Sequence, residues 1–343
     1  MTAKSPTILA PFAALYGIVT KTRVVLYRRG ILKSSKLAAP VLSVGNITAG
    51  GTGKTPLVEH LARIVAANGR KVCILTRGYG RENPGQRVIV SDGTEVLATD
   101  REAGDEPSLL ARNLRGVAAV ISDANRIAAG RWAIENLGTE VFVLDDGFQH
   151  LQLARNLNIA TIDASNPWGN GRLLPRGILR EPVAGLRRAD CIVITRANQT
   201  ENLEGLRDEL RSINNTAPLF TSRMRTRALF RLGTIERVEK PESPLAAFCA
   251  VGNHESFVRQ AEARELKIAK TVVFGDHHRY TQNDLDKIVN EARRAGSEAL
   301  LTTAKDAVKL GELSIPMSCY VLDIEIEIDS ADKFGDLVLA AIS

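Results

Sequence analysis

The sequence predicts an α/β protein that contains a mostly parallel sheet with helices on both faces. Short apolar segments of strand length recur along the chain, and amphipathic segments of helical length separate them. Several of the apolar segments end directly in turns rich in glycine and aspartate, as the carboxyl ends of parallel strands do. The 343 residues exceed what one core usually covers, so we expect a large domain and a smaller one.

Strands and helices alternate through residues 41–215, the predicted larger domain. A first strand is expected at 41–44, followed by a glycine-rich turn and a helix over 56–68 that ends at Gly69. The turn sequence Ser91-Asp92-Gly93-Thr94 lies between two short apolar runs and indicates a hairpin. Further strands are expected at 71–76, 117–121, 141–144, 159–163 and 191–195, and further helices at 107–113 and 126–136.

The same alternation begins again in residues 216–343, which predicts a smaller α/β/α domain. Its strands are expected at 245–251, 271–274 and 299–302, and its helices at 255–264 and 283–295. Extended segments at about 217–225 and 320–328 lie at its two ends. We expect them to pair as a two-stranded ribbon that joins the domains.

The turn after the first strand has the composition of a phosphate-binding loop. Its glycines allow backbone N–H groups to close around phosphate oxygens, and Lys54 supplies a mobile positive charge. Thr55 offers a hydroxyl group to Mg²⁺, while Thr48 stands where the general pattern has glycine. The residues expected to bind a nucleoside triphosphate are Thr48, Ala49, Gly50, Gly51, Thr52, Gly53, Lys54 and Thr55. The larger domain is therefore predicted to be P-loop NTPase-like.

Two pairs of carboxylates are candidates for chemistry beside this loop. Asp145 and Asp146 follow the predicted strand at 141–144, where a carboxylate commonly holds Mg²⁺ directly or through water. Asp105 and Glu106 stand immediately before a predicted helix. They either cap that helix, or one accepts a proton from an attacking hydroxyl while the other helps to hold the cation.

Histidine and arginine residues add further candidates. The run Asp276-His277-His278 either contributes to a metal site or supplies a histidine that orients a carboxylate base. Arginines close to glycine or proline turns either cap helices or bind phosphate groups during phosphoryl transfer. These arginines are Arg77, Arg126, Arg172, Arg176 and Arg180.

The first 40 residues form a basic and partly apolar segment of their own. No acidic residue precedes Glu59, and Ser5-Pro6 resembles a helix start. The apolar stretch is too short to span a membrane and contains Pro11 and Gly17. The residues that share one helical face are Ile8, Phe12, Leu15, Tyr16 and Val19. This face either packs on its own domain or lies in a membrane interface.

Composition excludes several other classes. The four cysteines are scattered through strand-like runs and form no CxxC pair, which indicates reduced core thiols in a cytosolic protein. The net charge of +6 suits an anionic partner. A nucleic-acid reader motif is absent from the sequence, so we expect no nucleic-acid partner. A P-loop GTPase or metallochaperone is the main alternative, but Lys305-Asp306 lacks the spacing of a guanine-selecting element.

Taken together, the motifs resemble those of the tetraacyldisaccharide 4′-kinase family over nearly the whole chain. The matching segments are Val44-Gly45-Asn46, Gly50-Gly51-Thr52-Gly53-Lys54-Thr55-Pro56, Arg77-Gly78-Tyr79-Gly80, Gly104-Asp105-Glu106-Pro107, Asp145-Asp146-Gly147-Phe148-Gln149-His150, Gly171-Arg172-Leu173-Leu174-Pro175, Arg180-Glu181-Pro182, Asp276-His277-His278 and Lys305-Asp306. The resemblance implies transfer of the ATP γ-phosphate to the 4′-hydroxyl of a tetraacyldisaccharide 1-phosphate, which would form lipid IVA in lipid A biosynthesis.

The resemblance also implies roles for particular residues. Asp105 would be the catalytic base, with His277 oriented against it, and Lys54 would act on the phosphates. The Mg²⁺ region would comprise Thr55, Glu106, Asp145 and Asp146. Substrate contacts would come from Arg77, Tyr79, Arg126, Gln149, His150, Arg172 and Arg176. The implied location is the cytoplasmic face of the inner membrane of a Gram-negative bacterium, with the protein bound peripherally as a monomer.

Overall fold

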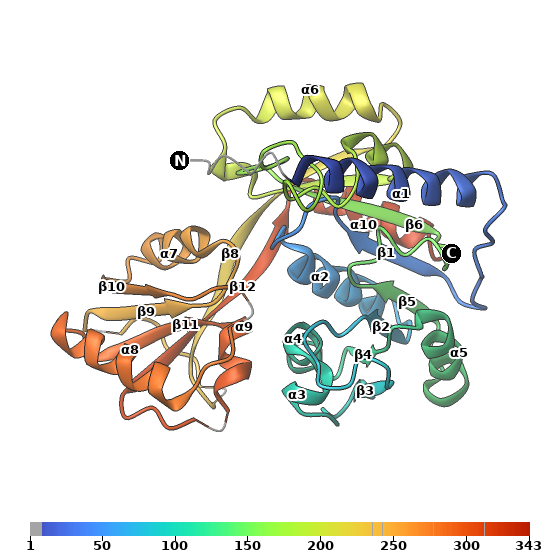
Figure 1. Cartoon of the computed structure of the whole chain (residues 1–343). Helices are drawn as coiled ribbons and strands as arrows, with labels where there is room; N and C mark the ends of the chain where they lie inside the picture. Colours follow the sequence, from blue (N-terminus) through green and yellow to red (C-terminus); the bar gives the residue numbers. More distant parts are fainter. Residues whose placement is uncertain (1–8, 235, 242, 277, 312) are drawn as a thin grey trace.

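The computed structural model describes residues 9–343 except residues 235, 242, 277 and 312. In this part of the chain, a sheet of 12 strands runs through the whole molecule in the order β10-β9-β11-β12-β8-β7-β6-β1-β5-β2-β4-β3. The expected α/β architecture with a mostly parallel sheet is confirmed. The sheet passes through two lobes that a twisted ribbon connects (Figure 1).

The larger lobe contains a parallel sheet that is buried on both faces, as its continuous apolar strands require. Its parallel strands are β1 (Val41–Gly45), β2 (Val72–Thr76), β4 (Ala118–Ser122), β5 (Val141–Leu144), β6 (Leu157–Asp163) and β7 (Cys191–Thr195), and β3 (Val88–Ser91) pairs antiparallel at the edge. Alternate strand residues contribute to two hydrophobic clusters, one on each side of the sheet. One cluster includes residues of α2 (Lys54–Ala67), α4 (Asp105–Asn113) and α10 (Ala331–Ala340), and the other includes residues of α5 (Arg126–Leu137). Helices therefore cover both faces, as predicted.

The smaller lobe repeats this arrangement around fewer strands. Its strands are β9 (Leu245–Cys249), β10 (Ile268–Val273), β11 (Ala299–Thr303) and β12 (Ser318–Ile328). Helix α7 (His254–Ala263) packs on one face through Phe257 and Ala261. Helix α8 (Gln282–Arg294) packs on the other through Leu285 and Ile288.

The expected ribbon is formed by β8 (Leu219–Arg231) and β12, which pair antiparallel from Ser222–Ile328 to Arg231–Tyr320. At its start β8 also pairs parallel with β7, so the ribbon joins the two sheets into one (Figure 1). After β12 the chain returns to the larger lobe, where Phe334 of α10 packs against Phe220. The predicted smaller domain therefore donates its last helix to the core of the larger one.

Helix α1 (Ala10–Arg28) lies along the larger lobe (Figure 1). It packs through Ala13 and Gly17, and a Cβ atom added at Gly17 would meet the Leu173 side chain at 2.7 Å. Ser5, Pro6 and Ile8 lie outside the described residues. Of the expected apolar face, Phe12, Leu15 and Val19 are exposed, and Tyr16 instead lines a cavity. No described helix is long and apolar enough to cross a membrane.

The remaining helices are short or lie at the surface. They are α3 (Asp100–Ala103), α6 (Leu203–Ile213) and α9 (Ala304–Ala307), and the 3₁₀ helices Val183–Arg188, Ala197–Gln199 and Val308–Leu310. Helix α6 packs beside β6 and β7 through Leu206 and Leu210. Helix α9 and the 3₁₀ helix after it contact α4, so the smaller lobe meets the larger one at the start of α4.

Candidate active site

A cavity of about 800 Å³ lies where the phosphate loop, α1 and both lobes meet. The larger lobe contributes the loop after β1, the ends of β2 and β5, and the first turn of α4. The smaller lobe contributes residues 251–253, 303–305 and 322–324. The cavity therefore opens at the carboxyl ends of the parallel strands, where α/β proteins bind ligands.

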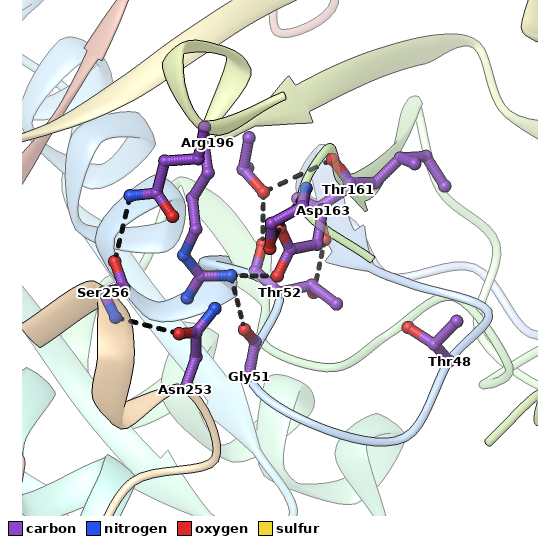
Figure 2. Close-up of polar contacts among 12 residues, drawn as sticks. Thr48, Gly51, Thr52, Thr161, Asp163, Arg196, Asn253 and Ser256 are labelled. Atoms are coloured by element: carbon purple, nitrogen blue, oxygen red, sulfur yellow. Dashed lines mark hydrogen bonds and ion pairs between the residues drawn. The ribbon is translucent and has the colours of Figure 1, made fainter. Parts of the chain in front are cut away.

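Polar side chains shape the phosphate loop from inside. The amide group of Asn46, at the end of β1, donates to the hydroxyls of Thr48 (3.2 Å) and Thr52 (2.9 Å). The Thr52 hydroxyl also bonds to Thr161 on β6 at 2.9 Å (Figure 2). Thr48 thus serves as a hydrogen-bond partner where the general pattern has glycine. Within the described chain, the amides of residues 50–53 have no intramolecular hydrogen-bond partner, which leaves them available to phosphate oxygens.

Lys54 is the first residue of α2 and faces two acceptors across the cavity. Its Nζ donates to Asn46 Oδ1 at 3.3 Å and lies 3.5 Å from Asp146 Oδ1. The Arg180 guanidinium donates to Asp146 Oδ2 at 2.6 Å. Burial alone would raise the pKa of Asp146, but Lys54 and Arg180 outweigh it and lower that pKa. Asp146 is therefore held as a carboxylate beside the phosphate loop.

Asp145, at the end of β5, has the opposite environment. Its side chain is buried and accepts a hydrogen bond from Thr76 at 3.2 Å. Burial, and then the neighbouring carboxylates Glu106 and Asp146, raise the pKa of Asp145 to about 7. Asp145, Asp146 and Glu106 thus line one cavity, and the repulsion that Asp145 feels from the other two carboxylates favours a cation close to them.

The oxygen donors at this position fit Mg²⁺. Asp146 Oδ1 is buried and lies 3.5 Å from Lys54 Nζ, with no hydrogen bond of ordinary geometry in the described structure. Carboxylate and hydroxyl oxygens are the ligands that Mg²⁺ prefers. Among the described residues, no group of three or more His, Cys, Asp or Glu side chains is arranged to hold a metal ion. A nucleotide phosphate would supply the missing oxygens, as is usual for Mg²⁺.

Asp105 and Glu106 open α4 and are contacted by two lysines of the smaller lobe. Lys309 Nζ lies 3.5 Å from Asp105 Oδ2, and Lys305 Nζ lies 3.2 Å from Glu106 Oε1. Lys305 also lies 3.4 Å from Asp276 Oδ1. Sequence reasoning gave these lysines no role, although the Lys305-Asp306 motif after β11 signalled their importance. Glu106 lines the cavity, whereas Asp105 is not among its described lining residues.

The expected partner of Asp105, His277, lies outside the described residues. The neighbouring His278 is placed elsewhere, because its Nε2 lies 3.1 Å from Asp284 Oδ2 and its ring stacks on Phe274. His278 is thus held within the smaller lobe. The role expected of His277 stays a prediction.

Five of the seven expected substrate contacts line the cavity: Arg77, Tyr79, Arg126, Gln149 and His150. Burial, followed by the Arg126 charge, lowers the pKa of His150 to about 4, so this imidazole is neutral at pH 7. Gln149 donates to the Asn46 carbonyl and to Glu181, both at 2.7 Å, which commits its amide to holding the loop. Arg172 and Arg176 are not among the described residues that line the cavity.

A nucleotide-sized cavity with an open phosphate loop, three carboxylates in its lining and a basic wall defines a P-loop phosphotransferase. Comparison with known proteins identifies the family. The chain matches the family model described as "LpxK: Tetraacyldisaccharide-1-P 4'-kinase" over residues 6–343, and it belongs to that family.

Individual relatives agree with this assignment. A tetraacyldisaccharide 4'-kinase of Halothermothrix orenii is 40% identical over 96% of this chain and 91% of its own length. A tetraacyldisaccharide 4'-kinase of Anaeromyxobacter dehalogenans is 42% identical over 90% of this chain and 82% of its own length. The crystal structure of LpxK from Aquifex aeolicus in complex with ATP superposes with a TM-score of 0.78, 32% identity and coverage of 98% of this chain and 99% of that one.

Proposed function

We propose that this protein transfers the γ-phosphate of ATP to the 4′-hydroxyl of a tetraacyldisaccharide 1-phosphate. The observation that carries the proposal is the position of the phosphate loop, opposite the Asp145–Asp146 pair and beside the basic wall formed by Arg77 and Arg126 in one cavity. This arrangement can hold a nucleotide at one end and an anionic acceptor at the other. The family assignment supplies the identity of the acceptor.

In this proposal the chain mainly positions and neutralises charge. The amides of residues 50–53 and Lys54 bind the β- and γ-phosphates, and Lys54 compensates the charge that develops during transfer. Thr55, Glu106, Asp145 and Asp146 would hold Mg²⁺, which would supply positive charge against the phosphate oxygens. Asp105, supported by His277, accepts the proton of the attacking hydroxyl.

The acceptor would lie toward the wall that contains Arg77, Arg126 and His150. A neutral His150 can accept or donate a hydrogen bond to the sugar, because burial keeps its pKa well below 7. Arg77 and Arg126 suit the anionic 1-phosphate or the transferred phosphoryl group. Arg172 and Arg176 would contact the acceptor outside the described cavity, at the surface beside α1.

We also propose that α1 rests on a membrane. An acceptor with several acyl chains is retained in a bilayer, so the enzyme must reach it there. Phe12 and Leu15 are 61% and 60% exposed on α1, and Arg28 and Arg29 lie exposed at its end. An apolar face beside basic residues fits an anionic lipid surface. The corresponding location is the cytoplasmic face of the inner membrane of a Gram-negative bacterium, with the protein as a peripheral monomer.

The direct test is transfer of ³²P from [γ-³²P]ATP to the disaccharide 1-phosphate in detergent micelles. The expected result is a radiolabelled product that carries phosphate at the 4′-position, formed only with Mg²⁺. Unlabelled GTP added as a competitor distinguishes an ATP enzyme from a GTPase. ATP hydrolysis without labelled lipid would contradict the proposed acceptor.

A further inference from the structure

Arg196 is a buried cation at the cavity that no sequence motif singles out. It directly follows β7 and adopts a left-handed backbone with φ 53° and ψ 37°. This region is unfavourable for a residue with a Cβ atom and persists only where surrounding contacts enforce it. The residue is 8% exposed and lines the cavity. Its conformation therefore calls for an explanation in the contacts that its side chain makes.

The Arg196 guanidinium contacts a backbone carbonyl of the phosphate loop. Its Nη1 donates to the Gly51 carbonyl at 2.9 Å and forms an ion pair with Asp163, the last residue of β6 (Figure 2). The preceding residue, Thr195, donates its hydroxyl proton to the Thr52 carbonyl at 2.9 Å. Two adjacent carbonyls of the loop are thus held by two adjacent residues at the end of β7.

Holding these carbonyls determines where the loop amides point. In a trans peptide the C=O and N–H groups point in opposite directions. A fixed Gly51 carbonyl therefore fixes the Thr52 amide, and a fixed Thr52 carbonyl fixes the Gly53 amide. Within the described chain both amides lack a hydrogen-bond partner, so they are available to phosphate oxygens.

We propose that Arg196 is a positioning residue of the phosphate loop, which sets ATP affinity by holding the Gly51–Thr52 peptide. This inference rests on the proposed ATP-dependent function. Asp163 neutralises the guanidinium and orients it toward the loop. The Ser165 hydroxyl in turn donates to Asp163 Oδ1 at 2.7 Å. With this left-handed backbone, the guanidinium lies within hydrogen-bond distance of the Gly51 carbonyl.

Contacts on the far side of Arg196 hold this backbone in place. The Gln199 amide donates to the Ser256 hydroxyl at 3.3 Å, and Arg259 donates to Gln199 Oε1 at 3.2 Å. Both partners belong to α7 of the smaller lobe. The segment from Arg196 to Gln199 is therefore anchored at both ends, which explains how the unfavourable φ value is maintained.

The test uses three variants: Arg196→Gly, Arg196→Lys and the double variant that combines Arg196→Gly with Asp163→Asn. For each variant, ATP binding is measured by calorimetry, and steady-state kinetics are measured with the acceptor in micelles. Glycine adopts the left-handed backbone freely, so Arg196→Gly removes the guanidinium without adding strain. We expect the ATP dissociation constant to rise by about tenfold or more in this variant, the loss typical of one charge-assisted hydrogen bond. The KM for ATP should rise in parallel, and the KM for the acceptor should not change.

The second and third variants separate positioning from simple structural loss. Arg196→Lys should recover part of the affinity, because an ammonium group can still donate to the Gly51 carbonyl. The double variant should bind ATP as weakly as Arg196→Gly. Restoration of affinity by Asp163→Asn would overturn the inference, because the defect would then come from an unpaired Asp163 carboxylate. Wild-type affinity in Arg196→Gly would also overturn it.

Arg223→Ala is the matched control, since Arg223 forms an exposed ion pair with Glu327 on the ribbon. It should leave ATP binding unchanged, and melting curves of all variants should show that they are folded. Failure of the wild-type protein to phosphorylate the acceptor would contradict the proposed function alone. The difference in ATP affinity between wild type and Arg196→Gly would still test the role of Arg196.

Discussion

Lys54 is the cation that contacts both the loop and the carboxylate pair, through Asn46 and Asp146. Lys54→Ala should reduce phosphoryl transfer by on the order of 10²-fold or more, because developing phosphoryl charge is left uncompensated. The measurement is kcat/KM for ATP, with Lys270→Ala as a control at an exposed ion pair of the smaller lobe. Near wild-type turnover at saturating ATP would contradict a catalytic role for this loop.

Asp105 and His277 are proposed to act as one unit. Alanine at either position should lower kcat far more than it changes KM, because the proton transfer occurs only in the transition state. The fold reduction in kcat of the double variant should be much smaller than the product of the fold reductions of the two single variants. Initial-rate kinetics on the four proteins provide the test. Losses that multiply fully would show that the two side chains work independently.

Glu59 on α2 is a buried carboxyl at the cavity whose only described side-chain hydrogen bond comes from Asn113, at 2.8 Å. Burial raises its pKa to about 7, although the Asn113 bond, Arg227 and Arg63 oppose the shift. The folded protein therefore retains a proton that the unfolded chain releases above pH 4.5. Its contribution to the free energy of unfolding falls as pH rises from about 4.5 to 7, by at most about 3 kcal/mol.

Glu59→Gln should remove this pH-dependent fall in the free energy of unfolding. The neutral amide can still accept the hydrogen bond from Asn113, and it does not titrate. The variant should melt at a higher temperature than wild type at pH 8, and the difference should shrink at pH 5. Thermal denaturation across this pH range is the measurement. A stability difference that does not depend on pH would show that the pKa of Glu59 is not raised.

At the scale of elements, α1 presents one face to the protein and another outward. Phe12→Asp with Leu15→Asp should weaken binding to anionic vesicles with little change in melting temperature, because both side chains are exposed. Vesicle pelleting and thermal melting provide the two measurements. Gly17→Leu is the contrasting variant, since its side chain would collide with Leu173 and should lower stability.

A double-aspartate variant that melts much earlier than wild type, while its folded fraction still binds vesicles, would contradict the membrane role of α1. Neutralising Arg28 and Arg29 gives an independent result. It should reduce vesicle binding by about 1 kcal/mol for each charge near the surface, in a salt-dependent way. Equal binding to neutral and anionic vesicles would contradict this electrostatic part.

At the scale of the whole molecule, Lys305 joins the two lobes across the cavity. Its ammonium group lies between Glu106 of the larger lobe and Asp276 of the smaller one. Lys305→Met should loosen this contact and speed hydrogen exchange at residues 304–310 and at the start of α4, because an ion pair at a protein surface contributes up to about 1 kcal/mol. Lys240→Met, at an exposed ion pair within the smaller lobe, is the control. Unchanged exchange at α4 would show that Lys305 does not hold the lobes together.

Much of the candidate site was predictable because it follows local rules. Lys54, Asp145 and Glu106 each stand beside a strand end or a helix start, and these positions meet at one edge of a parallel sheet. Tyr16 was predicted to share one helical face with Phe12 and Leu15, but the structure separates them, because Tyr16 lines the cavity while the other two side chains are exposed. Periodicity predicts which residues share a face of a helix, but it does not predict which face packs against the rest of the protein.

The amino-acid sequence was enough to predict most strands and helices, though not α6 or α10, and also the phosphate loop, the acidic motifs and the family. Each of these depends on residues that are neighbours along the chain. Tertiary structure alone decided which distant residues share the site. Lys305 and Glu106 are separated by 199 positions, and Arg196 and Gly51 by 145. It also decided that the β8–β12 ribbon makes one sheet of two and that α10 returns to the larger lobe. Such contacts depend on how the elements pack, and no local pattern of residue types encodes that packing.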